Sequence, residues 1–218
     1  MVPTVIYPQF CALARALELL GERWTLLIVR ELLLGPKRFS DLKARLDGIS
    51  ASVLSQRLSR LEEDALVHRS YLPPPAASTV FELTEQGCGL EPAVFELIRW
   101  GGRFLYPARP KERREPEWAG LVLKAYARKG GAPKRSFNVR LKEGDAEAVL
   151  NVRGTARGTT VSPGAAAADL TFSCGFETVL GLMSGRVSAE HALETELVGI
   201  DGDVAALAEF PEMFELRG

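Results

Sequence analysis

Residues 38–67 read RFSDLKARLDGISASVLSQRLSRLEEDALV and decide the fold of the first half of the chain. Two short helical patterns flank the residues DGIS, in which Gly48 accepts a turn conformation that other residues resist. Ser50 is a favourable N-cap, because its hydroxyl can accept a hydrogen bond from a free backbone N–H. The second pattern predicts a helix from about Ala51 to Asp64. Its buried stripe consists of Leu54, Leu58 and Leu61, with Val53 at the edge.

The opposite side of this predicted helix carries small polar residues instead of the Glu and Lys of an ordinary solvated helix. These residues are Ser52, Ser55, Gln56 and Ser59, beside Arg60. Serine lowers helix propensity relative to Glu or Lys, which favours a function for this face. The major groove of B-DNA admits one α-helix, and a Gln side chain can pair with adenine there. A solvated helix without a partner is the alternative that the pattern leaves open.

Basic residues surround the same helix in a chain whose formal net charge is −1. Residues 37–60 hold six basic and two acidic residues. Lys and Arg neutralise phosphates and fix the register of a protein on duplex DNA. Alone, such a charge run is also typical of a solvated face.

The flanking patterns extend the helical region in both directions. Residues 11–24 predict a helix whose stripe of Leu13, Leu17 and Leu20 faces a core, and residues 24–36 predict a central buried helix. Residues 39–46 predict a short helix with Phe39, Leu42 and Leu46 facing inward. Strands are expected at 66–72 and 79–84 around the loop PPPAAS, followed by a helix over 85–105. This order is that of a winged helix-turn-helix.

The second half restarts the pattern after a proline-rich, highly charged segment at 107–117, which we interpret as a linker. Helices are predicted at 118–128, 176–183 and 188–194 and from Asp203 onward, and strands at 136–141, 148–152, 169–174 and 196–201. The expected fold class is therefore α+β. We expect a first domain over 1–106, the linker over 107–117 and a second domain over 118–218.

Composition excludes several classes of protein. The 218 residues are 46% hydrophobic and 25% charged, as in soluble globular proteins. No apolar run reaches the length that spans a bilayer, and the first residues do not resemble a secretion signal. Three widely spaced cysteines suit neither a disulfide framework nor a zinc site, so we expect a cytoplasmic protein without membrane contact. No phosphate loop, dinucleotide motif or catalytic set stands out, and we expect no cofactor, no metal and no enzyme activity.

Residues 11–101 resemble the HxlR-type family of bacterial transcriptional regulators, relatives of the MarR group. The matching stretches are CALARALELLGERWTLLIVRELLLGPKRFSDL, GISASVLSQRLSRLEEDALV and FELTEQGCGLEPAVFELIRWG. The resemblance implies a homodimer whose terminal helices pair the subunits and which binds double-stranded DNA. It implies a recognition helix from Ser50 to Arg60 and a wing over 68–79, with His68 or Arg69 near the backbone or minor groove.

These considerations together predict a set of DNA-binding residues. The set is Lys37, Arg38, Ser50, Ser52, Ser55, Gln56, Arg57, Ser59, Arg60 and Arg69. The chain departs from the family in two places. Ala51-Ser52 replaces the usual Pro-Lys, so one basic contact is missing, and Ala65 replaces the Gly that usually follows the recognition helix.

The second half resembles the sterol carrier protein fold, on the stretch ADLTFSCGFETVLGLMSGRVSAEHALETELVGIDGDVAALAEF at 168–210. The resemblance implies an apolar cavity for a lipid-like or other small apolar ligand. The candidate pocket residues are Phe172, Phe176, Leu180, Met183 and Leu207. Such residues are also ordinary core residues.

Cys11 occupies the position of a redox-sensing cysteine in several members of the first family. A thiol at a helix start can have a lowered pKa, although Cys11 also fits a small buried hydrophobe. The function predicted from the sequence is that of a dimeric transcriptional regulator whose second domain either binds a small apolar ligand that controls it or adds dimer contacts. The alternative is a lipid or small-molecule carrier or sensor in which the winged helix mediates only protein–protein contacts.

Overall fold

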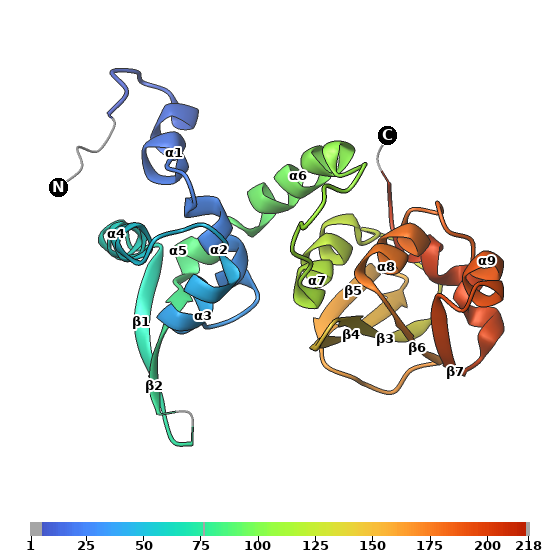
Figure 1. The fold of residues 1–218 in the computed structure, drawn as a ribbon. Helices are drawn as coiled ribbons and strands as arrows, with labels where there is room; N and C mark the ends of the chain where they lie inside the picture. Colours follow the sequence, from blue (N-terminus) through green and yellow to red (C-terminus); the bar gives the residue numbers. More distant parts are fainter. Residues whose placement is uncertain (1–5, 76, 217–218) are drawn as a thin grey trace. The chain divides into compact units, whose positions relative to one another are not determined.

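The computed structural model describes residues 6–75 and 77–216. These residues form two compact units, of which the first ends at Val94 and the second begins at Phe95. The α+β fold class is confirmed, with helices and a hairpin in the first unit and a five-stranded sheet with helices in the second (Figure 1). The domain boundaries expected at 106 and 118 stay a prediction.

The first unit follows the predicted element order, except that the single helix expected over 85–105 is divided after residue 88 and again after residue 101. Its helices are α1 (Ala12–Leu20), α2 (Thr25–Leu33), α3 (Phe39–Arg45), α4 (Ala51–Glu63) and α5 (Glu85–Cys88), and its strands are β1 (Val67–Leu72) and β2 (Ser78–Leu83). The two strands pair antiparallel and project from the helices as the predicted wing (Figure 1). Residue 76 lies outside the described residues. Helix α6 (Glu91–Gly101) begins in the first unit and ends in the second.

The core of the first unit is built where the periodicity of α2, α3 and α4 predicts it. Leu42 and Leu54 have no exposed surface, and Leu58 and Leu61 are 1% exposed. Phe39 is half-buried and packs against the same cluster. The first unit therefore has one apolar core, which lies beneath α4 and the turn that precedes it.

One prediction about the core is wrong for a single copy of the chain. The α1 stripe does not face a core, since Leu13 is 67% exposed and Leu17 is 44% exposed. Only Leu20 reaches the cluster, where it is half-buried. The stripe has the periodicity of a buried helix face, but no described element of this unit covers it.

The second unit places helices against a mixed sheet. The strands are β3 (Ser136–Glu143), β4 (Ala146–Thr155), β5 (Gly158–Pro163), β6 (Leu170–Cys174) and β7 (Val198–Gly202), in the order β5-β4-β3-β6-β7. Neighbours pair antiparallel except β3 and β6, which are parallel. The helical elements are η1 (Gly102–Phe104), α7 (Pro116–Tyr126), α8 (Phe176–Met183), α9 (Ala189–Glu194) and η2 (Val204–Met213).

Three features of the second unit differ from the sequence-based expectation. Strand β5 was not predicted, because Gly, Pro and two Thr residues in GTTVSP hide its alternation. The C-terminal helix is a 3-10 helix with Pro211 inside it, and proline cannot donate a hydrogen bond to a regular α-helical ladder. Helix α7 begins at Pro116, inside the segment interpreted as a linker.

Candidate nucleic-acid interface

The N-terminus of α4 is built as its sequence predicts. Ser50 is the N-cap, and its hydroxyl accepts a hydrogen bond from the backbone N–H of Val53 at 3.2 Å. The hydroxyl oxygens of Ser50 and Ser52 lie 3.0 Å apart. Gly48 in the preceding turn has a φ of 89°, a conformation that favours glycine. The turn and the cap together determine where α4 begins.

The polar side of α4 lies at the surface while its leucine stripe is buried. Ser52, Ser55 and Ser59 are exposed, and Gln56 is half-buried. Short side chains on an exposed helix let the helix backbone approach base edges closely. The geometry that a recognition helix requires is therefore present, with donors and acceptors outward and the apolar stripe inward.

Two of the predicted DNA-binding residues, Lys37 and Arg38, connect the helices to the wing. The backbone N–H of Lys37 donates to the carbonyl of Phe81 at 3.1 Å, and the carbonyl of Lys37 accepts from Phe81 at 2.8 Å. The guanidinium of Arg38 donates to the hydroxyl of Ser78 at 2.8 Å. Lys37 and Arg38 therefore lie beside β2.

Arg60 and Arg69 form ion pairs with neighbouring carboxylates. Arg60 lies 3.3 Å from Glu63 and 3.0 Å from Asp64, and Arg69 lies 2.8 Å from Glu62. The Arg69 guanidinium also lies over the Phe81 ring. Exposed ion pairs contribute only about 0–1 kcal/mol, so a phosphate can replace the carboxylate of Glu63, which is 64% exposed, at little cost. Asp64 is only 12% exposed. Burial raises the pKa of Asp64 above its usual value, and the charge of Arg60 opposes that rise.

Arg57 differs from the other predicted DNA-binding cations. Its guanidinium lies 2.7 Å from the carboxylate of Glu22 and donates to the carbonyl of Arg23 at 3.3 Å. Only 13% of its side chain is exposed. In this structure the Arg57 side chain links α4 to the segment before α2.

A buried carboxylate was not singled out by the sequence analysis. Glu31 has no exposed surface, and its two oxygens lie 2.6 Å from Arg30 and 2.7 Å from Arg45. The sequence did contain a signal for this site, because Glu31 is an acid inside the apolar run 24–36. An acid in a buried helix is expected to form an ion pair. This ion-pair group joins α2 to α3 and so supports the turn that leads to α4.

Cys11 lies at the N-cap position of α1 and is exposed, as is Cys88. The interpretation of Cys11 as a small buried hydrophobe is therefore wrong. Cys174 is buried, and this burial raises its pKa to about 12. Among residues 6–75 and 77–216, no group of His, Cys, Asp or Glu is arranged to hold a metal ion.

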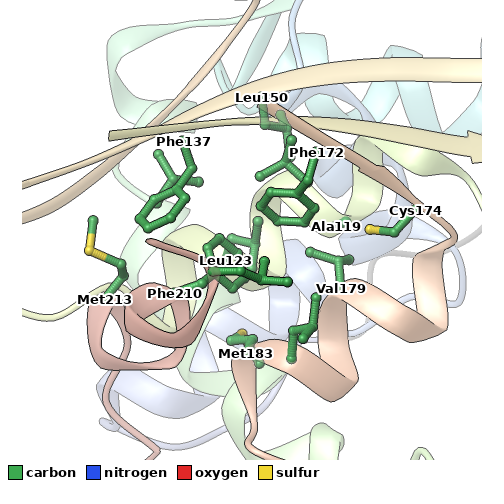
Figure 2. Packing of buried hydrophobic residues seen from close by; sticks show 14 of the residues in the cluster. Ala119, Leu123, Phe137, Leu150, Phe172, Cys174, Val179, Met183, Phe210 and Met213 are labelled. Atoms are coloured by element: carbon green, nitrogen blue, oxygen red, sulfur yellow. The ribbon is translucent and has the colours of Figure 1, made fainter. Parts of the chain in front are cut away.

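The candidate pocket residues of the second unit lie in its core. Phe172 and Leu207 have no exposed surface, Leu180 is 3% exposed, Met183 is 5% exposed and Phe176 is half-buried. Figure 2 shows Phe172, Met183 and neighbouring apolar side chains packed against one another. The rings of Phe137, Phe172 and Phe210 meet edge to face, with centroids 5.1–6.5 Å apart. A ligand among these residues would have to displace packed side chains.

Comparison with known proteins assigns both halves of the chain. A family described as HxlR-like helix-turn-helix matches residues 19–109. The uncharacterized HTH-type transcriptional regulator YvaP of Bacillus subtilis (strain 168) is 36% identical over 94 residues, which are 43% of this chain and 87% of that protein. This chain belongs to the HxlR-like family. A family described as SCP-2 sterol transfer matches residues 119–215, so this HxlR-like protein carries a sterol-carrier-type second domain.

Other relatives of the HxlR-like half are regulators as well. The HTH-type transcriptional regulator YodB of the same B. subtilis strain is 37% identical over 92 residues, 42% of this chain and 82% of YodB. The uncharacterized HTH-type transcriptional regulator Rv3095 of Mycobacterium tuberculosis (strain ATCC 25618 / H37Rv) is 43% identical over 94 residues, 43% of this chain and 59% of that protein. The prediction of a regulator family rather than an enzyme family is confirmed. Within the described part of the chain, no helix is long and apolar enough to cross a membrane.

Proposed function

We propose that this HxlR-like protein is a homodimeric transcriptional regulator in which α4 reads base edges of duplex DNA. The observation that carries the proposal is the exposed row of Ser52, Ser55 and Ser59 beside Gln56 on a helix whose leucine stripe is buried. Lys37, Arg38, Arg60 and Arg69 supply charge for phosphates around the row and along the wing. Arg57 serves as a positioning residue for α4.

Dimerisation is supported by apolar surface that one copy leaves uncovered. On α1 this surface includes Leu13 and Leu17, and around α6 it includes Leu97, Trp100 and Phe104, which are 48%, 62% and 65% exposed. Exposed apolar residues grouped on a helix often mark an interface. A second copy would cover these helices. The two α4 helices of the dimer would then bind half-sites about one DNA turn apart.

A mobility-shift or anisotropy titration tests the DNA-binding proposal on DNA from upstream of the protein's own gene. We expect specific binding that weakens steeply as salt rises. Gln56→Ala should weaken specific binding about ten-fold, because one bidentate base contact contributes about 1–3 kcal/mol of discrimination. Gln86→Ala, at an exposed position of α5, is the matched control and should bind as the unaltered chain does. A Gln56→Ala affinity equal to that of the control would refute the role of α4.

We also propose that the second domain takes a small apolar ligand among Phe172, Phe176, Leu180, Met183 and Leu207. The support is that the domain is of the sterol-transfer type, and a ligand would enter by displacing side chains of this apolar cluster. Thermal unfolding with and without palmitate tests the proposal, with butyrate as the short-chain control. We expect palmitate alone to raise the melting temperature, and an unchanged value in both would contradict a lipid-like ligand.

A further inference from the structure

The second unit separates its charges along the sequence. Of the eleven Lys and Arg residues in 118–218, six lie in the short segments 128–135 and 153–160. These two segments, RKGGAPKR and RGTARGTT, contain no acid, and all thirteen Asp and Glu residues of 118–218 lie elsewhere. Such segregation in a chain of net charge −1 is not the interspersed pattern of an ordinary solvated surface.

The fold brings the two segments together at one end of the sheet. The N–H groups of Gly131 and Ala132 donate to the carbonyls of Ala156 and Thr155 at 3.1 and 3.2 Å. The N–H of Thr159 donates to the carbonyl of Arg128 at 2.8 Å. These bonds bring the two segments together, and we call their six cations the basic surface: Arg128, Lys129, Lys134, Arg135, Arg153 and Arg157.

Glycine permits this close approach of the two segments. A Cβ on Gly158 would lie 2.3 Å from the carbonyl oxygen of Arg128, and a Cβ on Gly154 would lie 2.0 Å from that of Pro133. Gly158 also has a φ of 123°, which other residues rarely adopt. The basic surface therefore depends on two positions that tolerate no side chain.

Most of the charge on the basic surface is not neutralised. Arg135 lies 2.7 Å from Glu209, but the Arg128 and Arg153 guanidinium groups donate to the uncharged carbonyls of Glu212 and Ala167. Lys129, Lys134 and Arg157 are exposed, and within the described residues their side chains make no ion pair.

A hollow of about 620 Å³ lies within the basic surface, and Lys134, Arg135 and Arg153 are among its lining residues. Asp169 lines it as well and accepts hydrogen bonds from the N–H and hydroxyl of Ser136 at 2.7 and 3.0 Å. Those bonds, with the charges of Arg135 and Arg153, lower the pKa of Asp169 and keep it ionised. Asp169 is therefore one of three carboxylates that act on these cations, together with Glu209 and Asp203, which both act on Arg135.

We propose that the basic surface binds the phosphate backbone of duplex DNA, as a second, sequence-independent contact in addition to that of the winged helix. The proposal rests on the DNA-binding function proposed above. Between the cations stand Gly, Ala, Pro and Thr, which allow a phosphate backbone to approach closely. A membrane-binding surface adds Trp, Phe or Leu anchors, and a single-strand site adds aromatic rings for stacking. Neither segment contains any of these residues.

The slope of log affinity against log salt for the full chain tests this proposal. We compare Lys134→Gln/Arg157→Gln with Arg140→Gln/Lys142→Gln, a matched pair of exposed cations on β3 outside the basic surface. On a duplex of random sequence, each lost phosphate contact reduces the slope by about 0.9. The first variant should therefore lose up to about 1.8 in slope, and the control should lose none. The operator and the random duplex should lose affinity by similar factors, since phosphate contacts carry no sequence information.

Equal slopes for the two variants would overturn the proposal. Saturable binding of inorganic phosphate by the basic surface would also overturn it, if the DNA slope of Lys134→Gln/Arg157→Gln equals that of the unaltered chain. Binding to vesicles containing phosphatidylserine, lost in the first variant while its DNA slope is unchanged, would also overturn it. Failure of the proposed function is distinguishable, because Gln56→Ala alters preference for the operator, whereas the slope is measured on random DNA. Unchanged thermal melting of both variants shows that each is folded.

Discussion

The guanidinium of Arg57 lies 2.7 Å from the carboxylate of Glu22, and this ion pair joins α4 to the segment between α1 and α2. The two residues are 35 positions apart in the chain. Arg57 stands on the recognition helix, where sequence reasoning assigned it to DNA. Its contacts instead orient the helix that carries the exposed Ser and Gln side chains.

The first prediction concerns this pair. Arg57→Gln and Glu22→Gln should each destabilise the chain, and the double variant should lose less than the sum, with a coupling energy of about 1 kcal/mol. Urea unfolding of the four proteins provides the double-mutant cycle. Strictly additive effects would mean that the ion pair contributes nothing to the position of α4.

Glu31 is expected to be far more sensitive than surface carboxylates. Glu31→Gln removes the charge of the buried carboxylate that Arg30 and Arg45 share, and breaking a buried ion pair costs about 3–5 kcal/mol. Glu63 is an ion-pair partner of Arg60, and its side chain is 64% exposed. Glu63→Gln should therefore lower the free energy of unfolding by less than about 1 kcal/mol. Urea midpoints measure both, and similar losses would contradict a structural role for the buried group.

Ala65 follows α4 with a φ of 55°, in the left-handed region where a Cβ is unfavourable by about 1–2 kcal/mol. Ala65→Gly should therefore stabilise the protein by up to about 1 kcal/mol, after the greater unfolded-state entropy of glycine is subtracted. Ala44→Gly, at an exposed position inside α3, should instead destabilise by about 1 kcal/mol. Thermal melting compares them, and a loss of stability in Ala65→Gly would show that the turn carries no strain.

The oligomeric state should respond to the exposed apolar residues of α6. Trp100→Glu places a charge on a side chain that is 62% exposed in one copy, and we expect it to shift the protein from dimer to monomer. Leu197→Glu, at a position 41% exposed before β7, is the control and should remain dimeric. Sedimentation velocity distinguishes the states. A Trp100→Glu dimer of unchanged affinity would exclude this face from the interface.

Thiol reactivity should separate the three cysteines. At pH 8 in the folded protein, a thiol reagent should modify Cys11 and Cys88, which are exposed, and spare Cys174. Because burial raises the pKa of Cys174, its thiol stays protonated at pH 8, and the thiolate is the reactive form. Reagent absorbance counts the thiols before and after unfolding. Three rapidly reacting thiols in the folded state would contradict this burial.

The same reagents test the redox prediction for Cys11. If Cys11 senses oxidants, diamide treatment should change the DNA affinity of the unaltered chain and leave Cys11→Ser unchanged. Cys88→Ser is the matched control, since Cys88 is also exposed. An unaltered affinity after diamide treatment would remove Cys11 from regulation.

Much of the winged-helix half could be predicted because its signals are local. The leucine spacing of α4, the Ser50 cap and the Gly48 turn all depend on neighbours within a few residues. Less of the fold of the second half could be predicted from the sequence. Strand β5 has no strong alternation, and its pairing with β4 is what defines it.

The amino-acid sequence by itself determined the order of the elements, the inward stripe and outward polar row of α4, and the family to which the chain belongs. Only the tertiary structure showed that Leu13 and Leu17 remain exposed in one copy and that Arg57 forms an ion pair with Glu22. The structure alone also joined the segments 128–135 and 153–160 into one basic surface. The physical reason is that periodicity and capping act over one or two helical turns, whereas burial and ion pairing depend on residues that meet only after the chain has folded.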